Sequence, residues 1–131
     1  NYLQSNIMKE SFEKLVNLTR KLRGEGGCPW DQKQTIESMK KSILDEAQEV
    51  ADAIDNKDME NLEEELGDLL FVIVFISNIA REEGIFDLKD SLKGIHDKLI
   101  RRHPHVFGDK KATTADEALA LFNEAKKLEK K

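Results

Sequence analysis

Apolar residues recur along this chain at intervals of three and four, the spacing that places side chains on one face of an α-helix. Together with capping residues such as Thr35, Asp58 and Thr114, this pattern predicts five helices. We expect them at about residues 7–23, 35–56, 59–83, 87–103 and 114–128. No stretch alternates as a strand would. The sequence therefore predicts an all-α helical bundle of about five helices, with a loop over Gly24–Gln34.

The third of these helices differs from the others because its second half, Leu69–Ile76, is apolar on every side. A helix of that kind needs packing partners all round. Five helices in 131 residues can hardly provide them. We therefore expect a second copy of the chain to cover part of this helix, in a homodimer or a dimer of dimers.

Composition and charge narrow the class of protein. A length of 131 residues favours one domain, which we place at residues 8–131, with residues 1–7 as a disordered start or an expression remnant. The net charge of −5 argues against a nucleic-acid polymer as partner. The longest apolar run has eight residues, too few for a bilayer, so no membrane partner is expected. Cys28 stands alone, which excludes an intrachain disulfide and suits a cytoplasmic location.

Two pairs of acidic residues are the main candidates for chemistry. Glu46 and Glu49 are three residues apart on one predicted helix, and Glu65 and Asp68 are three apart on the next. Residues at this spacing point the same way, so two facing helices could offer four carboxylates to one small volume. An acidic run on a helix is most often a solvated face. Here, however, Glu65 and Asp68 continue an apolar, core-facing stripe, and carboxylates rarely go inside unpaired.

Carboxylates that share a partly buried volume require a cation to neutralise them. No histidine lies on either stripe, which disfavours zinc and di-iron sites. All-oxygen ligation instead favours Mg²⁺, with Mn²⁺ as the alternative and Ca²⁺ a weaker candidate.

A second cluster is cationic. Lys98, Arg101 and Arg102 share one face near the end of the fourth helix. Such residues can simply complement the helix dipole, but arginine forks also bind phosphate oxygens in pairs. The loop adds Trp30 and Lys33. Trp30 is either a core anchor or a surface on which a base stacks, and Lys33 either is solvated or contacts a phosphate.

These parts together suggest attack of water on a phosphoanhydride, assisted by a metal ion. A carboxylate would take the proton, and neutralisation of charge would supply most of the rate. No glycine-rich phosphate-binding loop of the P-loop type is present.

The chain closely resembles the MazG family of nucleoside triphosphate pyrophosphohydrolases over about residues 12–108, which we take as the core of the domain. The matching stretches are GGCPWDQKQT (Gly26–Thr35), LDEAQEVADAI (Leu44–Ile54), EELGDLLFVIVF (Glu64–Phe75), EEGIFDL (Glu82–Leu88) and KLIRRHPHVFG (Lys98–Gly108).

The resemblance implies an all-α fold whose four-helix bundle is completed by dimerisation, and Mg²⁺-dependent hydrolysis of NTPs and dNTPs to monophosphate and pyrophosphate. It implies three sets of site residues: metal ligands and catalytic carboxylates Glu46, Glu49, Glu65 and Asp68; phosphate contacts Lys98, Arg101 and Arg102; nucleotide neighbours Trp30 and Lys33. One departure concerns Asp45, where the family usually has glutamate, so a direct role for Asp45 is in doubt.

The sequence leaves two other functions open. A helical dimer could bind a nucleotide or a partner protein as a sensor without catalysis, although the intact acidic quartet argues against this. A carboxylate-bridged redox metal site would need histidines that the two helices lack.

Overall fold

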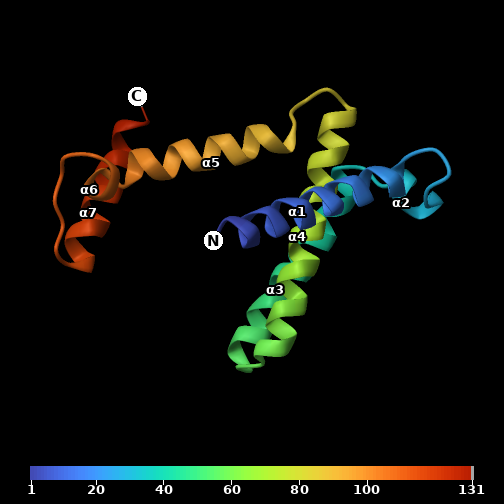
Figure 1. Cartoon of the computed structure of the whole chain (residues 1–131), viewed down its shortest axis with the longest axis horizontal. Coiled ribbons are helices and arrows are strands. Elements are labelled where there is room, and N and C mark those ends of the chain that lie inside the picture. The colour runs from blue at the N-terminus through green and yellow to red at the C-terminus, as the bar shows by residue number, and fades with distance from the viewer. Residues whose placement is uncertain (131) are drawn as a thin grey trace. The chain divides into compact units, whose positions relative to one another are not determined.

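A computed structural model describes residues 1–130 of the chain, and within that range every regular element is helical (Figure 1). The all-α class predicted from the sequence is confirmed. None of the described helices is both long enough and apolar enough to cross a lipid bilayer. The elements are α1 (Tyr2–Arg23), α2 (Pro29–Lys33), the 3₁₀ turn η1 (Glu37–Met39), α3 (Lys40–Asp55), α4 (Met59–Glu82), α5 (Leu88–Arg102), α6 (Pro104–Phe107) and α7 (Ala115–Leu128).

The chain divides into two compact units, one from Asn1 to Leu88 and the other from Lys89 onward. The single domain expected at residues 8–131 stays a prediction.

The first unit is built on the hairpin of α3 and α4, which pack along each other, with α1 packed against α4. Asp58 begins α4 by accepting a hydrogen bond from the backbone N–H of Asn61 at 3.1 Å, as its sequence position predicts. Gly84 has a φ of +71°, and α4 ends just before it at Glu82. Both ends of the long helix are therefore encoded locally.

The core of this unit lies along one face of α4. Val72, Phe75 and Ile79 are buried there against Met39, and the half-buried residues Ile36, Ile43, Phe71 and Ile76 surround them. Burying each large apolar side chain contributes about 1.5–3 kcal/mol. Glu65 and Asp68 precede Val72 by seven and four residues, so the same periodicity that builds the core directs both carboxylates toward α3.

The opposite face of α4 remains uncovered within a single chain. Leu66, Leu70 and Ile73 are 49%, 40% and 42% exposed, and their spacing of four and three residues places them on one stripe. We call these three residues the outer stripe of α4. Val72, Val74 and Phe75 are buried within this chain, whereas Leu70 and Ile73 are not. The predicted burial of Leu69–Ile76 on every side is therefore not met along the outer stripe by the residues of this chain.

Some predicted boundaries were wrong. Helix α1 starts at Tyr2 and not near residue 7, because the Asn1 side chain caps it by accepting from the N–H of Gln4 at 3.0 Å. Residues 2–7 are accordingly helical, so the helix start expected near residue 7 was wrong. The loop expected at residues 24–34 contains the short helix α2, whose Pro29 is preorganised for a first helical position.

The second unit contains most of α5, together with α6 and α7. Helix α5 ends at Arg102, two residues before Pro104, as expected. Thr114 caps α7 by accepting from the N–H of Glu117 at 3.2 Å, which confirms the predicted cap. The short helix α6, which follows Pro104 directly, was not predicted.

Candidate functional site

Helices α3 and α4 bring three of the four predicted carboxylates together. Glu46 comes from α3, and Glu65 and Asp68 come from α4. Each offers one carboxylate oxygen, and these three oxygens lie within 4.8 Å of one another. Glu46 and Glu65 are half-buried, whereas Asp68 is exposed. We call these three residues the carboxylate cluster.

Glu49, the fourth predicted acid, is exposed and lies outside that set of oxygens. Its charge nevertheless acts on the cluster. Burial is the main cause that raises the pKa of the Glu65 carboxyl above its ordinary value, and the negative charges of Glu49, Asp68 and Glu46 raise this pKa further. Excess negative charge therefore gathers around Glu65, as the sequence predicted.

The cluster fits a divalent cation. One oxygen of Glu46, Oε2, is buried and has no hydrogen-bond partner among residues 1–130. A buried carboxylate oxygen without a partner is costly unless a ligand satisfies it. Three carboxylates with no nitrogen or sulfur ligand beside them in the described cluster match the preference of hard cations such as Mg²⁺ and Mn²⁺.

Asp45, the residue next to Glu46, forms an ion pair with Lys41 and does not join the carboxylate cluster. Its Oδ2 accepts from Nζ of Lys41 at 2.7 Å on the exposed side of α3. This ion pair raises the pKa of Lys41, chiefly through the hydrogen bond to Asp45. Asp45 is therefore held at the surface, consistent with the doubt that its departure from the family pattern raised.

Trp30 and Lys33 both lie on the short helix α2 in the first unit. Trp30 is 59% exposed, so it is not a core anchor within this chain. Lys33 is exposed as well. In the described part of the chain, neither side chain forms a hydrogen bond or ion pair with the carboxylate cluster. Their place beside a nucleotide stays a prediction.

The predicted phosphate contacts Lys98, Arg101 and Arg102 lie on the last turns of α5, in the second unit. Both arginines bind Glu129: Arg101 donates through Nε to Oε2 at 3.0 Å, and Arg102 donates through Nη2 and Nε to Oε1 at 2.7 and 3.1 Å. Arg102 also lies over the ring of Phe122, with 5.5 Å from Cζ to the ring centroid. The side chain of Arg102 is 17% exposed and that of Arg101 is 55% exposed. Arg101 is thus the more available of the two.

Sequence reasoning missed Glu129, because residues 126–131 read as a solvated charged end. It also missed Arg23, whose side chain forms an ion pair with Glu82 at 2.9 Å. The partners are 28 and 59 residues apart, so no local pattern could have paired them. The one available signal for Glu129 was an acid standing alone among four lysines.

The pairing of Glu129 predicts a pH dependence. Hydrogen bonding to Arg102 is the largest cause that lowers the pKa of Glu129, and Arg101 lowers it further. A carboxyl with a depressed folded pKa stabilises the protein above its unfolded pKa, and this contribution is lost as pH falls through the folded pKa. We expect Glu129→Gln to lower the urea midpoint at pH 7, and the difference from wild type to shrink below about pH 4.5. A difference that stays constant from pH 7 to pH 3 would contradict the pairing.

Comparison with known proteins agrees with this geometry. A family profile described as the MazG nucleotide pyrophosphohydrolase domain matches residues 34–107, more than half of the chain and all three members of the carboxylate cluster. The chain belongs to the MazG family.

Relatives within the MazG family extend the match. The chain is 50% identical over 105 residues to a Thermotoga maritima protein named nucleoside triphosphate pyrophosphohydrolase/pyrophosphatase MazG, covering 78% of this chain and 41% of that one. It is 45% identical over 120 residues to an Escherichia coli protein named nucleoside triphosphate pyrophosphohydrolase, and the match covers 91% of this chain and 46% of that one. The chain thus spans less than half the length of either relative.

A solved structure gives the same result for the MazG fold. The crystal structure of a MazG-related protein from Thermotoga maritima matches with a TM-score of 0.72 at 33% sequence identity. The match covers 88% of this chain and 98% of the other. The fold therefore corresponds to nearly the whole of a MazG-related chain.

Proposed function

We propose that this chain hydrolyses nucleoside triphosphates, NTPs and dNTPs, to nucleoside monophosphate and pyrophosphate, with Mg²⁺ or Mn²⁺ as cofactor. The observation that carries the proposal is the carboxylate cluster, three acids with oxygens within 4.8 Å and one buried oxygen left unpartnered. The names of the Thermotoga maritima and Escherichia coli relatives support the same substrate class.

Glu46, Glu65 and Asp68 are the residues that would hold the cation, with Glu49 one helical turn from Glu46 to complete the set. When bound, Mg²⁺ supplies neutralisation of the phosphate charge and lowers the pKa of water. A carboxylate beside the bound water would accept its proton.

The remaining predicted residues would bind the substrate. Lys98 and Arg101 offer positive charge to the phosphates, and Arg102 shares that face of α5. Trp30 offers an exposed aromatic surface for the base, with Lys33 on the same short helix. The assignment of these five residues rests on the family motifs, and Trp30, Lys33 and Arg101 are exposed as well.

The two arginines should differ in their effects. Arg101→Ala is expected to lower kcat/KM by about tenfold, the value of one charge-assisted hydrogen bond, with little change in melting temperature because its side chain is largely exposed. Arg102→Ala should lower the melting temperature, because it removes two hydrogen bonds to Glu129 and the contact with Phe122. Steady-state kinetics and thermal melts on both variants check this. Equal effects of the two changes on stability would contradict it.

The rival function is a sensor that binds a nucleotide or a partner protein without turnover. Pyrophosphate release, followed over many turnovers with Mg²⁺ and again with excess EDTA, separates the two. The proposal predicts linear, metal-dependent release well beyond one equivalent per chain. Metal-dependent nucleotide binding with no release would favour the sensor.

We also propose that the chain forms a homodimer or a dimer of dimers. The outer stripe of α4 supports this, because Leu66, Leu70 and Ile73 are apolar, exposed and aligned on one face. The cytoplasmic location and the absence of a nucleic-acid polymer as partner stay predictions.

A further inference from the structure

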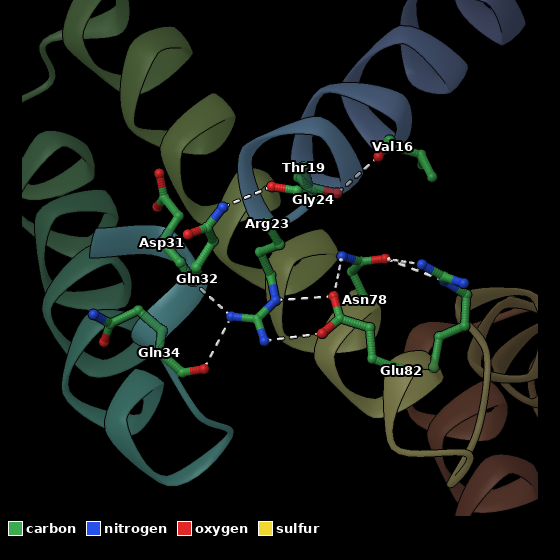
Figure 2. A network of polar contacts seen from close by, with 10 residues as sticks. Val16, Thr19, Arg23, Gly24, Asp31, Gln32, Gln34, Asn78 and Glu82 are labelled. Atoms are coloured by element: carbon green, nitrogen blue, oxygen red, sulfur yellow. Dashed lines mark hydrogen bonds and ion pairs between the residues drawn. The ribbon is translucent and has the colours of Figure 1, made fainter. Parts of the chain in front are cut away.

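The side chain of Arg23, at the end of α1, joins the short helix α2 to α4 (Figure 2). Nη1 of Arg23 donates to the backbone carbonyl oxygens of Asp31 at 2.6 Å and of Gln34 at 2.9 Å. Asp31 lies in α2 and Gln34 is its C-cap, at the end where a helix leaves carbonyl oxygens exposed. The Asp31 carbonyl also accepts from the backbone N–H of Gln34 at 3.3 Å. A guanidinium placed there satisfies both acceptors and also favours the helix dipole.

The remaining donors of the Arg23 guanidinium bind Glu82 on α4. Nε and Nη2 of Arg23 donate to the two oxygens of Glu82, each at 2.9 Å, in a bidentate pair. Glu82 also accepts from Nδ2 of Asn78 at 3.0 Å (Figure 2). Cζ of Arg23 lies 5.6 Å from the ring centroid of Phe75. The Arg23 side chain is only 9% exposed. Arg23 is therefore held rigidly on the helix that carries Glu65 and Asp68.

The backbone before α2 is also tightly placed. A Cβ atom on Gly27 would lie 2.3 Å from the carbonyl oxygens of Lys21 and Leu22, so this close approach requires glycine. On the exposed side, Nε2 of Gln32 donates to the carbonyl of Gly24 at 2.6 Å. The position of the half-exposed Trp30 therefore depends on how well the α2 backbone is anchored.

We propose that Arg23 is a positioning residue for nucleotide binding, holding the backbone of α2 on α4 so that Trp30 and Lys33 are preorganised toward the nucleotide. The inference rests on the proposed function, because it assigns Trp30 and Lys33 to the substrate. Preorganisation lowers the cost of ordering a loop on binding. Loosening α2 should therefore weaken substrate binding and leave the carboxylate cluster intact.

Arg23→Lys tests the proposal, since lysine keeps the positive charge beside Glu82 but cannot donate from a planar fork to four acceptors at once. Arg20→Lys is the matched control, the same change on an exposed residue one turn earlier in α1. Gln32→Ala removes the exposed attachment of the same loop without touching the core, and so keeps the test valid should Arg23→Lys fold poorly.

The first readout needs no catalysis. Trp30 is the only tryptophan, so time-resolved fluorescence anisotropy reports the motion of α2 directly. We expect the amplitude of the fast decay to rise by about twofold in Arg23→Lys, less in Gln32→Ala and not at all in Arg20→Lys. The second readout is kinetic: KM for a triphosphate should rise about fivefold in Arg23→Lys with kcat nearly unchanged.

The outcomes are distinguishable. If Arg23→Lys lowers the melting temperature but leaves both Trp30 anisotropy and KM as in Arg20→Lys, Arg23 is merely structural and the inference is overturned. Equal losses of kcat and kcat/KM would also overturn it, because they point to the reacting centre. If wild type releases no pyrophosphate, the proposed function fails, while Trp30 anisotropy still decides whether Arg23 anchors α2.

Discussion

Asp68→Asn is expected to reduce kcat/KM for a nucleoside triphosphate by about a hundredfold or more, the scale seen when a charged group at a reacting centre is removed. The change keeps the shape of the side chain and removes one negative charge from the carboxylate cluster. Because the acids around Glu65 repel one another, the metal-free variant should be as stable as wild type or more so. Glu65→Gln should behave in the same way. Both variants should therefore lose activity, while their metal-free stability stays unchanged or rises.

Thermal melts with and without Mg²⁺ measure the stability side of this prediction. A ligand that binds only the folded state raises stability by mass action, by about 2.7 kcal/mol at a hundred times its dissociation constant. The Mg²⁺ shift in melting temperature should be clear in wild type and much smaller in Asp68→Asn. Asp45→Asn is the control, because Asp45 is paired with Lys41 at the surface and lies outside the cluster. Full activity together with an unchanged Mg²⁺ shift in Asp68→Asn would place the metal elsewhere.

Ile73→Lys is expected to convert an oligomer into monomer. Ile73 is the last member of the outer stripe of α4, and a lysine there would place a charge within an apolar contact. Burying three such side chains on each of two copies contributes about 1.5–3 kcal/mol per residue, enough to decide a dimer. Ile85→Lys is a matched control, since Ile85 is 61% exposed and lies beyond the end of α4.

Light scattering coupled to size-exclusion chromatography measures the assembly of all three proteins. Wild type and Ile85→Lys should elute as a dimer or a multiple of it, and Ile73→Lys should shift toward the mass of one chain. A stable, folded wild-type monomer at micromolar concentration would show that the outer stripe is not an interface between copies.

Much of the fold could be predicted because its signals are local. The apolar stripe of α4, its Asp58 cap and its Gly84 stop all lie within or beside the helix itself. The short helix α2 could not be predicted in this way, since five residues have too few internal hydrogen bonds to form alone. Arg23 reaches α2 from another element and binds the carbonyl oxygens at its end. Periodicity carries no information about such contacts.

In the candidate site too, features with a local sequence signal could be predicted, and contacts between residues distant in sequence could not. Glu65 and Asp68 could be identified because an acidic pair interrupts a core-facing stripe, and the structure brings them to Glu46. The contact of Glu129 with two arginines depends on how α7 folds back on α5 within the second unit, which residue spacing does not encode. This contact bears on the predicted role of Arg102 as a phosphate ligand. Its guanidinium already donates two hydrogen bonds to Glu129 in the absence of substrate.

The central claim is hydrolysis between the α and β phosphorus, and identification of both products tests it most directly. Purified protein would be incubated with a panel of NTPs and dNTPs and Mg²⁺, and the products separated by anion-exchange chromatography, with Asp68→Asn run in parallel. The account predicts nucleoside monophosphate and pyrophosphate in equal amounts from wild type, and little of either from the variant. Nucleoside diphosphate and orthophosphate as products would contradict it.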